Sequence, residues 1–140
     1  MNIVQCPQSF FGKPRPWVVA AHLYEADRQE LYDVASTSNL TGTVLDVVPM
    51  GEHLGSKEEC YEWRLVAMNE ADMILMSLDG IGDSMTEFGI YAPRGNVILV
   101  GDLPEFPPHY YQLLIRQFSV PRINKSKQVI DLLEQQLEEE

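Results

Sequence analysis

The fold is decided by the stretch Ala71-Asp72-Met73-Ile74-Leu75-Met76-Ser77-Leu78, followed by Asp79-Gly80-Ile81-Gly82-Asp83-Ser84-Met85-Thr86-Glu87-Phe88-Gly89-Ile90-Tyr91-Ala92 and closed by Asn96-Val97-Ile98-Leu99-Val100-Gly101. It contains a short apolar run, a loop of Gly and Asp, a short helical segment and a second apolar run. This order predicts a strand, a loop, a helix and a strand, which is the repeating unit of a parallel sheet. Ligands of such sheets bind beyond the carboxyl ends of the strands, so a site is expected at the acidic loop after Leu78 and at Glu87.

Apolar patterns elsewhere in the chain extend this unit in both directions. Strands are expected at residues 17–23 and 43–48, and a short strand at residues 3–5 is also compatible with the pattern. Helices are expected at residues 27–35, 56–70, 109–118 and 126–140, with Ser126 as the N-cap of the last one. The helix over residues 56–70 has apolar residues on most of its circumference, which predicts burial on more than one side.

These elements predict one α/β domain over residues 1–140, large enough to bury about two-thirds of its unfolded surface in a single core. We expect a three-layer sandwich of the flavodoxin or Rossmann type, with a central, mostly parallel sheet of about five strands. Residues 1–16 contain three prolines and Gly12, and they predict an extended lead-in.

Composition restricts the partners of the chain. The formal net charge is −11 and the pI is about 4.6, which argues against a nucleic-acid polymer but not against free nucleosides or nucleotides. No apolar run approaches the ~20 residues that span a bilayer, and the N-terminus lacks a basic segment followed by an apolar one. We therefore expect a cytoplasmic protein that does not enter a membrane.

Metal and cofactor motifs are missing from the sequence. The three histidines lie in separate segments without metal-ligand spacing. Neither the Gly-x-Gly-x-x-Gly fingerprint nor the P-loop pattern with its lysine occurs. We expect no metal site and no cofactor.

The pair Ala71-Asp72 and the step Glu87-Phe88-Gly89-Ile90-Tyr91-Ala92 resemble the nucleoside 2-deoxyribosyltransferase family and its looser relatives. The segment Cys60-Tyr61-Glu62-Trp63-Arg64-Leu65 is similar to a helix of the shorter relatives, and Trp17-Val18-Val19-Ala20-Ala21 to their first strand. The resemblance covers residues 17 to 101. It implies a homo-oligomer, and it implies that Glu87 is the nucleophile that attacks the anomeric carbon of a 2-deoxyribosyl group.

The chain departs from the family pattern around the expected site, where the loop before Glu87 is also about two residues shorter than in the transferases. The family usually has a carboxylate eight residues before the aspartate of the Ala-Asp pair, where it helps to hold or protonate the base; here Arg64 stands there. An arginine does not deliver a proton at neutral pH. Arg64 therefore has two interpretations, as a residue that binds a phosphate and as a helix residue in an ion pair. The first strand also ends in Ala21-His22 instead of the usual Ala-Gly, which places His22 among the substrate-binding candidates.

Each remaining candidate has a structural interpretation beside the functional one. For Glu87 the structural interpretation is a helix capping box with Ser84, which the spacing of the two residues fits. The functional interpretation is an ionised nucleophile, since a helix N-terminus favours a negatively charged carboxylate. Asp79 and Asp83 either bind sugar hydroxyls or shape the turn. Ser84 could receive a monophosphate together with backbone amides. Tyr91 either stacks on a nucleobase or lies in the core.

The sequence thus predicts cleavage or transfer of the N-glycosidic bond of a 2-deoxynucleoside or its 5′-monophosphate, through a covalent glycosyl-enzyme intermediate on Glu87. One alternative is a non-catalytic module with the same fold that binds or senses a nucleotide. Another is an oligomeric interaction protein with an acidic surface and no small-molecule ligand.

Overall fold

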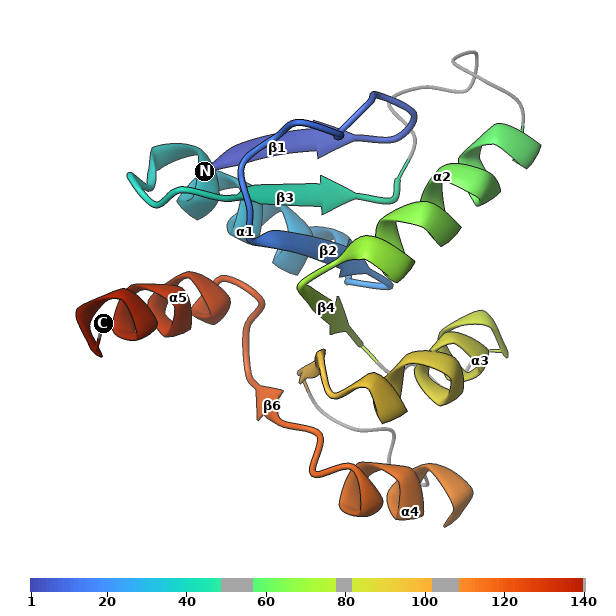
Figure 1. Ribbon diagram of the computed structural model, residues 1–140. Helices are drawn as coiled ribbons and strands as arrows, with labels where there is room; N and C mark the ends of the chain where they lie inside the picture. The colour runs from blue at the N-terminus through green and yellow to red at the C-terminus, as the bar shows by residue number, and fades with distance from the viewer. Residues whose placement is uncertain (49–56, 78–81, 102–108, 140) are drawn as a thin grey trace.

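A parallel sheet lies between two groups of helices in the computed structural model, which describes residues 1–48, 57–77, 82–101 and 109–139 (Figure 1). The strands of the described residues are β1 Asn2–Gln5, β2 Trp17–Ala21, β3 Thr43–Asp46, β4 Met73–Met76, β5 Val97–Val100 and β6 Arg122–Ile123. The helices are α1 Glu25–Thr37, α2 Lys57–Glu70, α3 Gly82–Tyr91, α4 His109–Gln117 and α5 Gln128–Glu139, with a 3₁₀ turn η1 at Ala92–Arg94.

The sheet has the strand order β1-β3-β2-β4-β5-β6, and every neighbouring pair is parallel. Val19 of β2 is in register with Leu45 of β3 on one side and with Ile74 of β4 on the other. The predicted α/β sandwich is confirmed. The sheet has six strands rather than five because β6, with only two residues, pairs with the end of β5.

Both faces of the central strands are covered, which explains their continuous apolar sequences. All five residues of β2 are buried. Val19 and Ala21 pack into one apolar cluster with residues of α2 and α3, whereas Val18 and Ala20 pack into a second cluster with residues of α1 and α5. The sheet therefore separates the layer of α2, α3 and α4 from the layer of α1 and α5.

The lead-in contributes to the core instead of only running along the surface. It includes β1, which pairs with β3, and the buried Phe10, whose ring meets those of Trp17 and Trp63 edge-on. The carboxylate of Asp72 accepts hydrogen bonds from the backbone N–H of Trp17 at 2.7 Å and from Arg15 at 3.0 Å. Asp72 thus holds the start of β2 beside the start of β4.

Two local predictions about helices are wrong. The helix α2 buries Trp63, Ala67 and Met68 on one side only, and it leaves Leu65 exposed on the other. The hydroxyl of Ser126 does not cap α5, because it donates to the backbone oxygen of Asp27 at 3.1 Å. The side chain of Gln128 instead accepts hydrogen bonds from the two backbone N–H groups of residues 124 and 125.

None of the helices in the described ranges is long and apolar enough to cross a membrane.

Candidate active site at the carboxyl edge of the sheet

The direction of the chain reverses between β2 and β4. The chain leaves β2 through α1 toward β3, and it leaves β4 through α3 toward β5, on the other side of the pair. The helices α1 and α3 also cover opposite faces of the sheet. Such a topological switch point opens a crevice at the carboxyl ends of the two strands, where open α/β sheets bind their ligands.

His22 follows β2 at this switch point and has an unusual backbone. The alternation of the strand would place its side chain on the α1 face, with Val18 and Ala20. Its φ of +45° lies in the left-handed region instead. The imidazole reaches the opposite layer, where it contacts Arg64 of α2 and Glu87 of α3. The left-handed backbone at His22 therefore goes together with a side chain that lies on the other face of the sheet from Val18 and Ala20.

Glu87 is the centre of a cluster that three separate elements form. Its Oε1 lies 2.5 Å from Nε2 of His22, and its Oε2 accepts a hydrogen bond from Nε of Arg64 at 3.0 Å. Nη2 of Arg64 donates to Oε1 as well, so the guanidinium grips both oxygens. The side chains of His22, Glu87 and Arg64 are 16%, 17% and 21% exposed, so the cluster is mostly buried but remains in contact with solvent.

The cluster keeps Glu87 ionised. Burial alone would raise the pKa of this carboxyl group, but the hydrogen bonds from His22 and Arg64 and their positive charge outweigh burial and hold the pKa below its usual value. A carboxylate at this position is therefore an anion at neutral pH. It is also fixed in direction by two partners.

The capping-box interpretation of Glu87 is wrong. The helix α3 begins at Gly82, two residues before Ser84, so Glu87 is its sixth residue and lies beyond the first turn. The expectation that the carboxylate of Glu87 lies at a helix N-terminus fails for the same reason. Its carboxylate bonds to His22, which follows β2, and to Arg64 of α2.

Arg64 has the ion-paired role that the sequence left as one of two interpretations. It lies on the side of α2 that faces α3, eight residues before Asp72. At the position where the resembling family usually has a carboxylate, this chain has the cation that binds Glu87.

The other predicted site residues contribute less to the described site. Tyr91 is 2% exposed, lies in the core and carries the Arg94 guanidinium 4.9 Å from its ring centre, so it has the core role of its two interpretations. Burial raises the pKa of its hydroxyl. Asp79 lies outside the described residues, as does the rest of the acidic loop between Leu78 and Gly82. Asp83 and Ser84 belong to the first residues of α3, but their side chains lie outside the described part.

A buried carboxylate on the other face was not predicted. Asp46 ends β3, is 1% exposed, accepts the backbone N–H of Val48 at 3.0 Å and lies 3.6 Å from Nη1 of Arg28 in α1. The signal in the sequence was a single Asp inside the apolar run of residues 43–48. Within the described ranges, no group of three or more His, Cys, Asp or Glu side chains could hold a metal ion.

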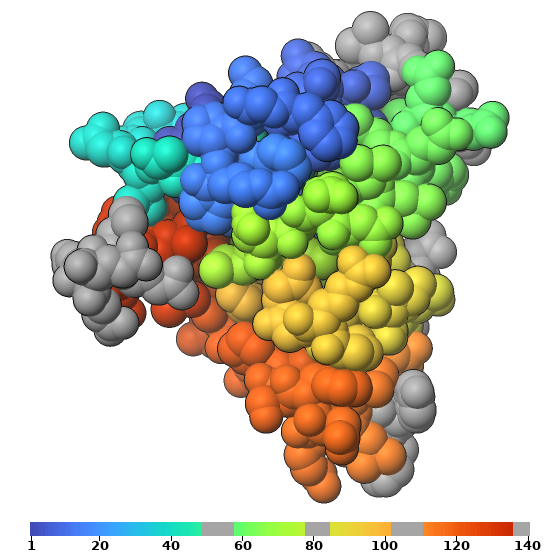
Figure 2. All heavy atoms as spheres, viewed as in Figure 1, coloured from blue at the N-terminus to red at the C-terminus, as the bar shows by residue number. Residues whose placement is uncertain are grey.

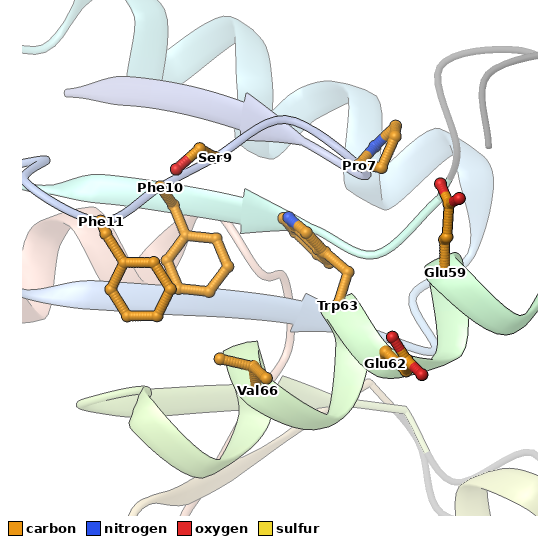
Figure 3. Close-up of a pocket in the computed structure, with 8 residues that line it drawn as sticks. All are labelled: Pro7, Ser9, Phe10, Phe11, Glu59, Glu62, Trp63 and Val66. Carbon is orange, nitrogen blue, oxygen red and sulfur yellow. The ribbon is translucent and has the colours of Figure 1, made fainter.

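A separate hollow of about 340 Å³ lies on another side of α2 (Figure 3). It is bounded by α2 and the segment after β1, and its lining residues are Pro7, Ser9, Phe10, Phe11, Glu59, Glu62, Trp63 and Val66. Trp63 closes one wall and donates its indole N–H to the backbone oxygen of Gln8 at 2.7 Å. His22, Arg64, Glu87 and Tyr91, the predicted site residues whose side chains are described, do not line this hollow.

Fold and site together define an α/β protein with an ionised carboxylate at the switch point of a parallel sheet. No protein-family model matches the chain, and no curated protein matches it. The resemblance to the nucleoside 2-deoxyribosyltransferase family therefore stays a prediction.

The left-handed backbone at His22 gives a test of this geometry. We expect His22→Gly to be more stable than His22→Ala by about 1 kcal/mol, because both lose the imidazole but only alanine keeps a Cβ in the left-handed region. Urea unfolding measures the difference. Gln29, an exposed residue in the middle of α1, is the matched control, where alanine should be more stable than glycine by a similar amount. An equal or reversed order at position 22 would contradict the left-handed conformation.

Proposed function

We propose that the protein cleaves or transfers the N-glycosidic bond of a 2-deoxynucleoside, or of its 5′-monophosphate, through a covalent intermediate on Glu87. The observation that supports this most is the carboxylate of Glu87, which Arg64 and His22 hold ionised at the carboxyl edge of the sheet. An ionised carboxylate with a fixed direction is the nucleophile of retaining glycosidases.

The chemistry takes two displacements at the anomeric carbon. An oxygen of Glu87 forms a bond with C1′ while the C1′–N bond breaks, and the bonding electron pair leaves with the base, which takes up a proton. Water or a second base then attacks C1′, the bond to Glu87 breaks, and its electron pair restores the carboxylate. The attacking water or base gives up a proton in this step. A 2-deoxy sugar favours both steps, because a 2′-hydroxyl would disfavour the oxocarbenium character of the transition states.

Arg64 and His22 are positioning residues in this proposal. Both contact Glu87 and therefore lie on the side of the nucleophile. The base departs from the opposite side of the sugar, so its proton comes from water or from another group there. Asp79 and Asp83 remain proposed partners of the sugar hydroxyls, and Ser84 of a 5′-phosphate.

A binding or sensing module without catalysis is the second candidate. Both oxygens of Glu87 already accept hydrogen bonds from cationic or imidazole donors, which lowers their nucleophilicity until a substrate displaces one of these donors. The ligand would be the same small nucleoside or nucleotide. The net charge of −11 supports a free nucleotide over a nucleic-acid polymer.

We also propose a cytoplasmic location and a homo-oligomeric state for the protein.

A panel of small molecules tests the two candidates against each other. The full chain is incubated with 2-deoxynucleosides, their 5′-monophosphates and the matching ribonucleosides, and chromatography measures free base while thermal unfolding measures binding. We expect base release from 2-deoxy compounds only. A thermal shift without base release would support the binding module. The absence of both base release and a thermal shift would contradict both candidates.

A further inference from the structure

The two cysteines of the chain lie side by side, although they are far apart in the sequence. Cys6 directly follows β1, Cys60 lies near the start of α2, and both are free thiols. The S–H group of Cys6 donates a hydrogen bond to the sulfur of Cys60. The two sulfur atoms are therefore in direct contact.

Hydrogen bonds of the neighbouring backbone hold this contact in place. The backbone N–H of Cys6 donates to the backbone oxygen of Asp46 at 2.9 Å, which fixes the segment after β1 to the end of β3. One turn after Cys60, the indole N–H of Trp63 donates to the backbone oxygen of Gln8 at 2.7 Å, which fixes the same segment to α2. Figure 2 shows the first residues of the chain, in blue, packed against α2, in green. The fold itself thus brings the two thiols together.

The two thiols differ in their access to solvent. Cys6 is fully buried in the apolar cluster under α2, whereas Cys60 packs against this cluster and is partly exposed. Burial and the hydrogen bond to Cys60 raise the pKa of Cys6 to about 12, so Cys6 stays protonated at neutral pH. The thiolate is the reactive form of cysteine. An oxidant that arrives from solvent therefore reacts with Cys60 and not with Cys6.

We propose that Cys6 and Cys60 form a redox-active pair, in which hydrogen peroxide oxidises Cys60 and Cys6 then completes a disulfide. The exposed carboxylates of Glu58 and Glu62 lie near Cys60 on α2, and the net charge of the chain is −11. These charges disfavour an anionic oxidant, whereas hydrogen peroxide is neutral. The proposal does not depend on the chemistry proposed for Glu87.

The oxidation takes two steps. The thiolate of Cys60 attacks one oxygen of hydrogen peroxide, the O–O bond breaks, and the departing oxygen takes up a proton and leaves as water. Cys60 is then a sulfenic acid, so its thiolate no longer opposes the ionisation of Cys6. The sulfur of Cys6 attacks that of Cys60, the S–O bond breaks, and the proton of Cys6 leaves with the hydroxide as a second water. One peroxide is thus reduced to two waters while two thiols are oxidised to one disulfide.

The disulfide joins α2 to the end of β1. Arg64 lies one turn after Cys60 on the same helix, so the bond restrains the helix that holds Glu87. A link between residues so far apart in the sequence also restricts the unfolded chain, which stabilises the folded protein. Reduction by a dithiol restores both thiols and releases the restraint.

Mass spectrometry of the full chain tests the pair. The reduced protein is treated with hydrogen peroxide, unfolded and alkylated with N-ethylmaleimide. We expect both cysteines to be alkylated before oxidation and neither afterwards, and we expect the peptide of Cys6 to be joined to that of Cys60 within one chain. Thiols that remain free, a cross-link between two chains, or a sulfinic or sulfonic acid without a cross-link would each overturn the proposal.

Substitution of one cysteine at a time separates the two roles. In Cys6→Ala the oxidation should stop at the sulfenic acid of Cys60, which dimedone traps, and in Cys60→Ser the buried Cys6 should stay reduced. In urea unfolding, peroxide should lower the unfolding equilibrium constant of the wild-type chain by about 10²-fold and should not lower that of Cys60→Ser. The same variant controls for oxidation of methionine. A dimedone adduct on Cys6, or an equal effect of peroxide on the stability of wild type and Cys60→Ser, would contradict the assigned roles.

Discussion

Glu87→Gln should lower the release of base from a 2-deoxynucleoside by about 10³-fold or more, because the substitution removes the ionised oxygen that would attack C1′. Glutamine has nearly the same size and keeps an oxygen that can accept the hydrogen bond from Arg64. We therefore expect the variant to fold and to bind the ligand. Chromatography of the free base measures the rate, and thermal unfolding shows that the protein is native during the assay.

Glu58→Gln is the matched control for this prediction. Glu58 is an exposed glutamate on α2 and has no part in the cluster of Glu87. Its substitution makes the same change of charge and should leave the rate unchanged. Base release by Glu87→Gln at the wild-type rate would contradict a nucleophilic role for Glu87.

Arg64→Met should raise the pKa of Glu87 and destabilise the fold at neutral pH by about 1–3 kcal/mol, because a half-buried carboxylate loses its cationic partner. In the wild-type chain the pKa of Glu87 lies below the ordinary value of 4.5. The ionised carboxylate therefore stabilises the fold above pH 4.5, and this stabilisation is lost as the pH falls through the pKa of the folded state. The difference in stability between wild type and variant should shrink over that acidic range.

Two measurements check the effect of Arg64. An NMR titration of the Glu87 carboxyl carbon reports its pKa, and urea unfolding at a series of pH values reports stability. Arg122→Met removes an exposed arginine from β6 and should change neither the pKa of Glu87 nor the pH dependence. An unchanged pKa in Arg64→Met would show that the ion pair does not control the ionisation of Glu87.

The central strands could be predicted because burial on both faces leaves continuous apolar runs in the sequence. Residues 18–21 and 73–76 are the clearest cases, and both lie in the middle of the sheet. The strand β6 could not be predicted, since its two residues include an exposed arginine and form no apolar run. The order of the strands in the sheet could not be predicted from local sequence patterns either, because it depends on which helices cross over which strands.

The candidate site could be predicted only in part, because its residues are far apart in the sequence. The motif around Glu87 predicted a functional carboxylate after a buried strand. Its contacts with Arg64 and His22 join residues that are 23 and 65 positions away, and no local pattern contains them. The face of the sheet on which the His22 side chain lies could not be predicted either. It depends on a left-handed backbone, which residues other than glycine rarely adopt.

Intact-mass spectrometry of the protein, quenched in acid while it turns over a 2-deoxynucleoside, tests the central claim most directly. The account predicts a mass increase of one deoxyribosyl group, located on the peptide that contains Glu87 and absent from Glu87→Gln. Base release without any adduct, or an adduct on another residue, would contradict the covalent mechanism through Glu87.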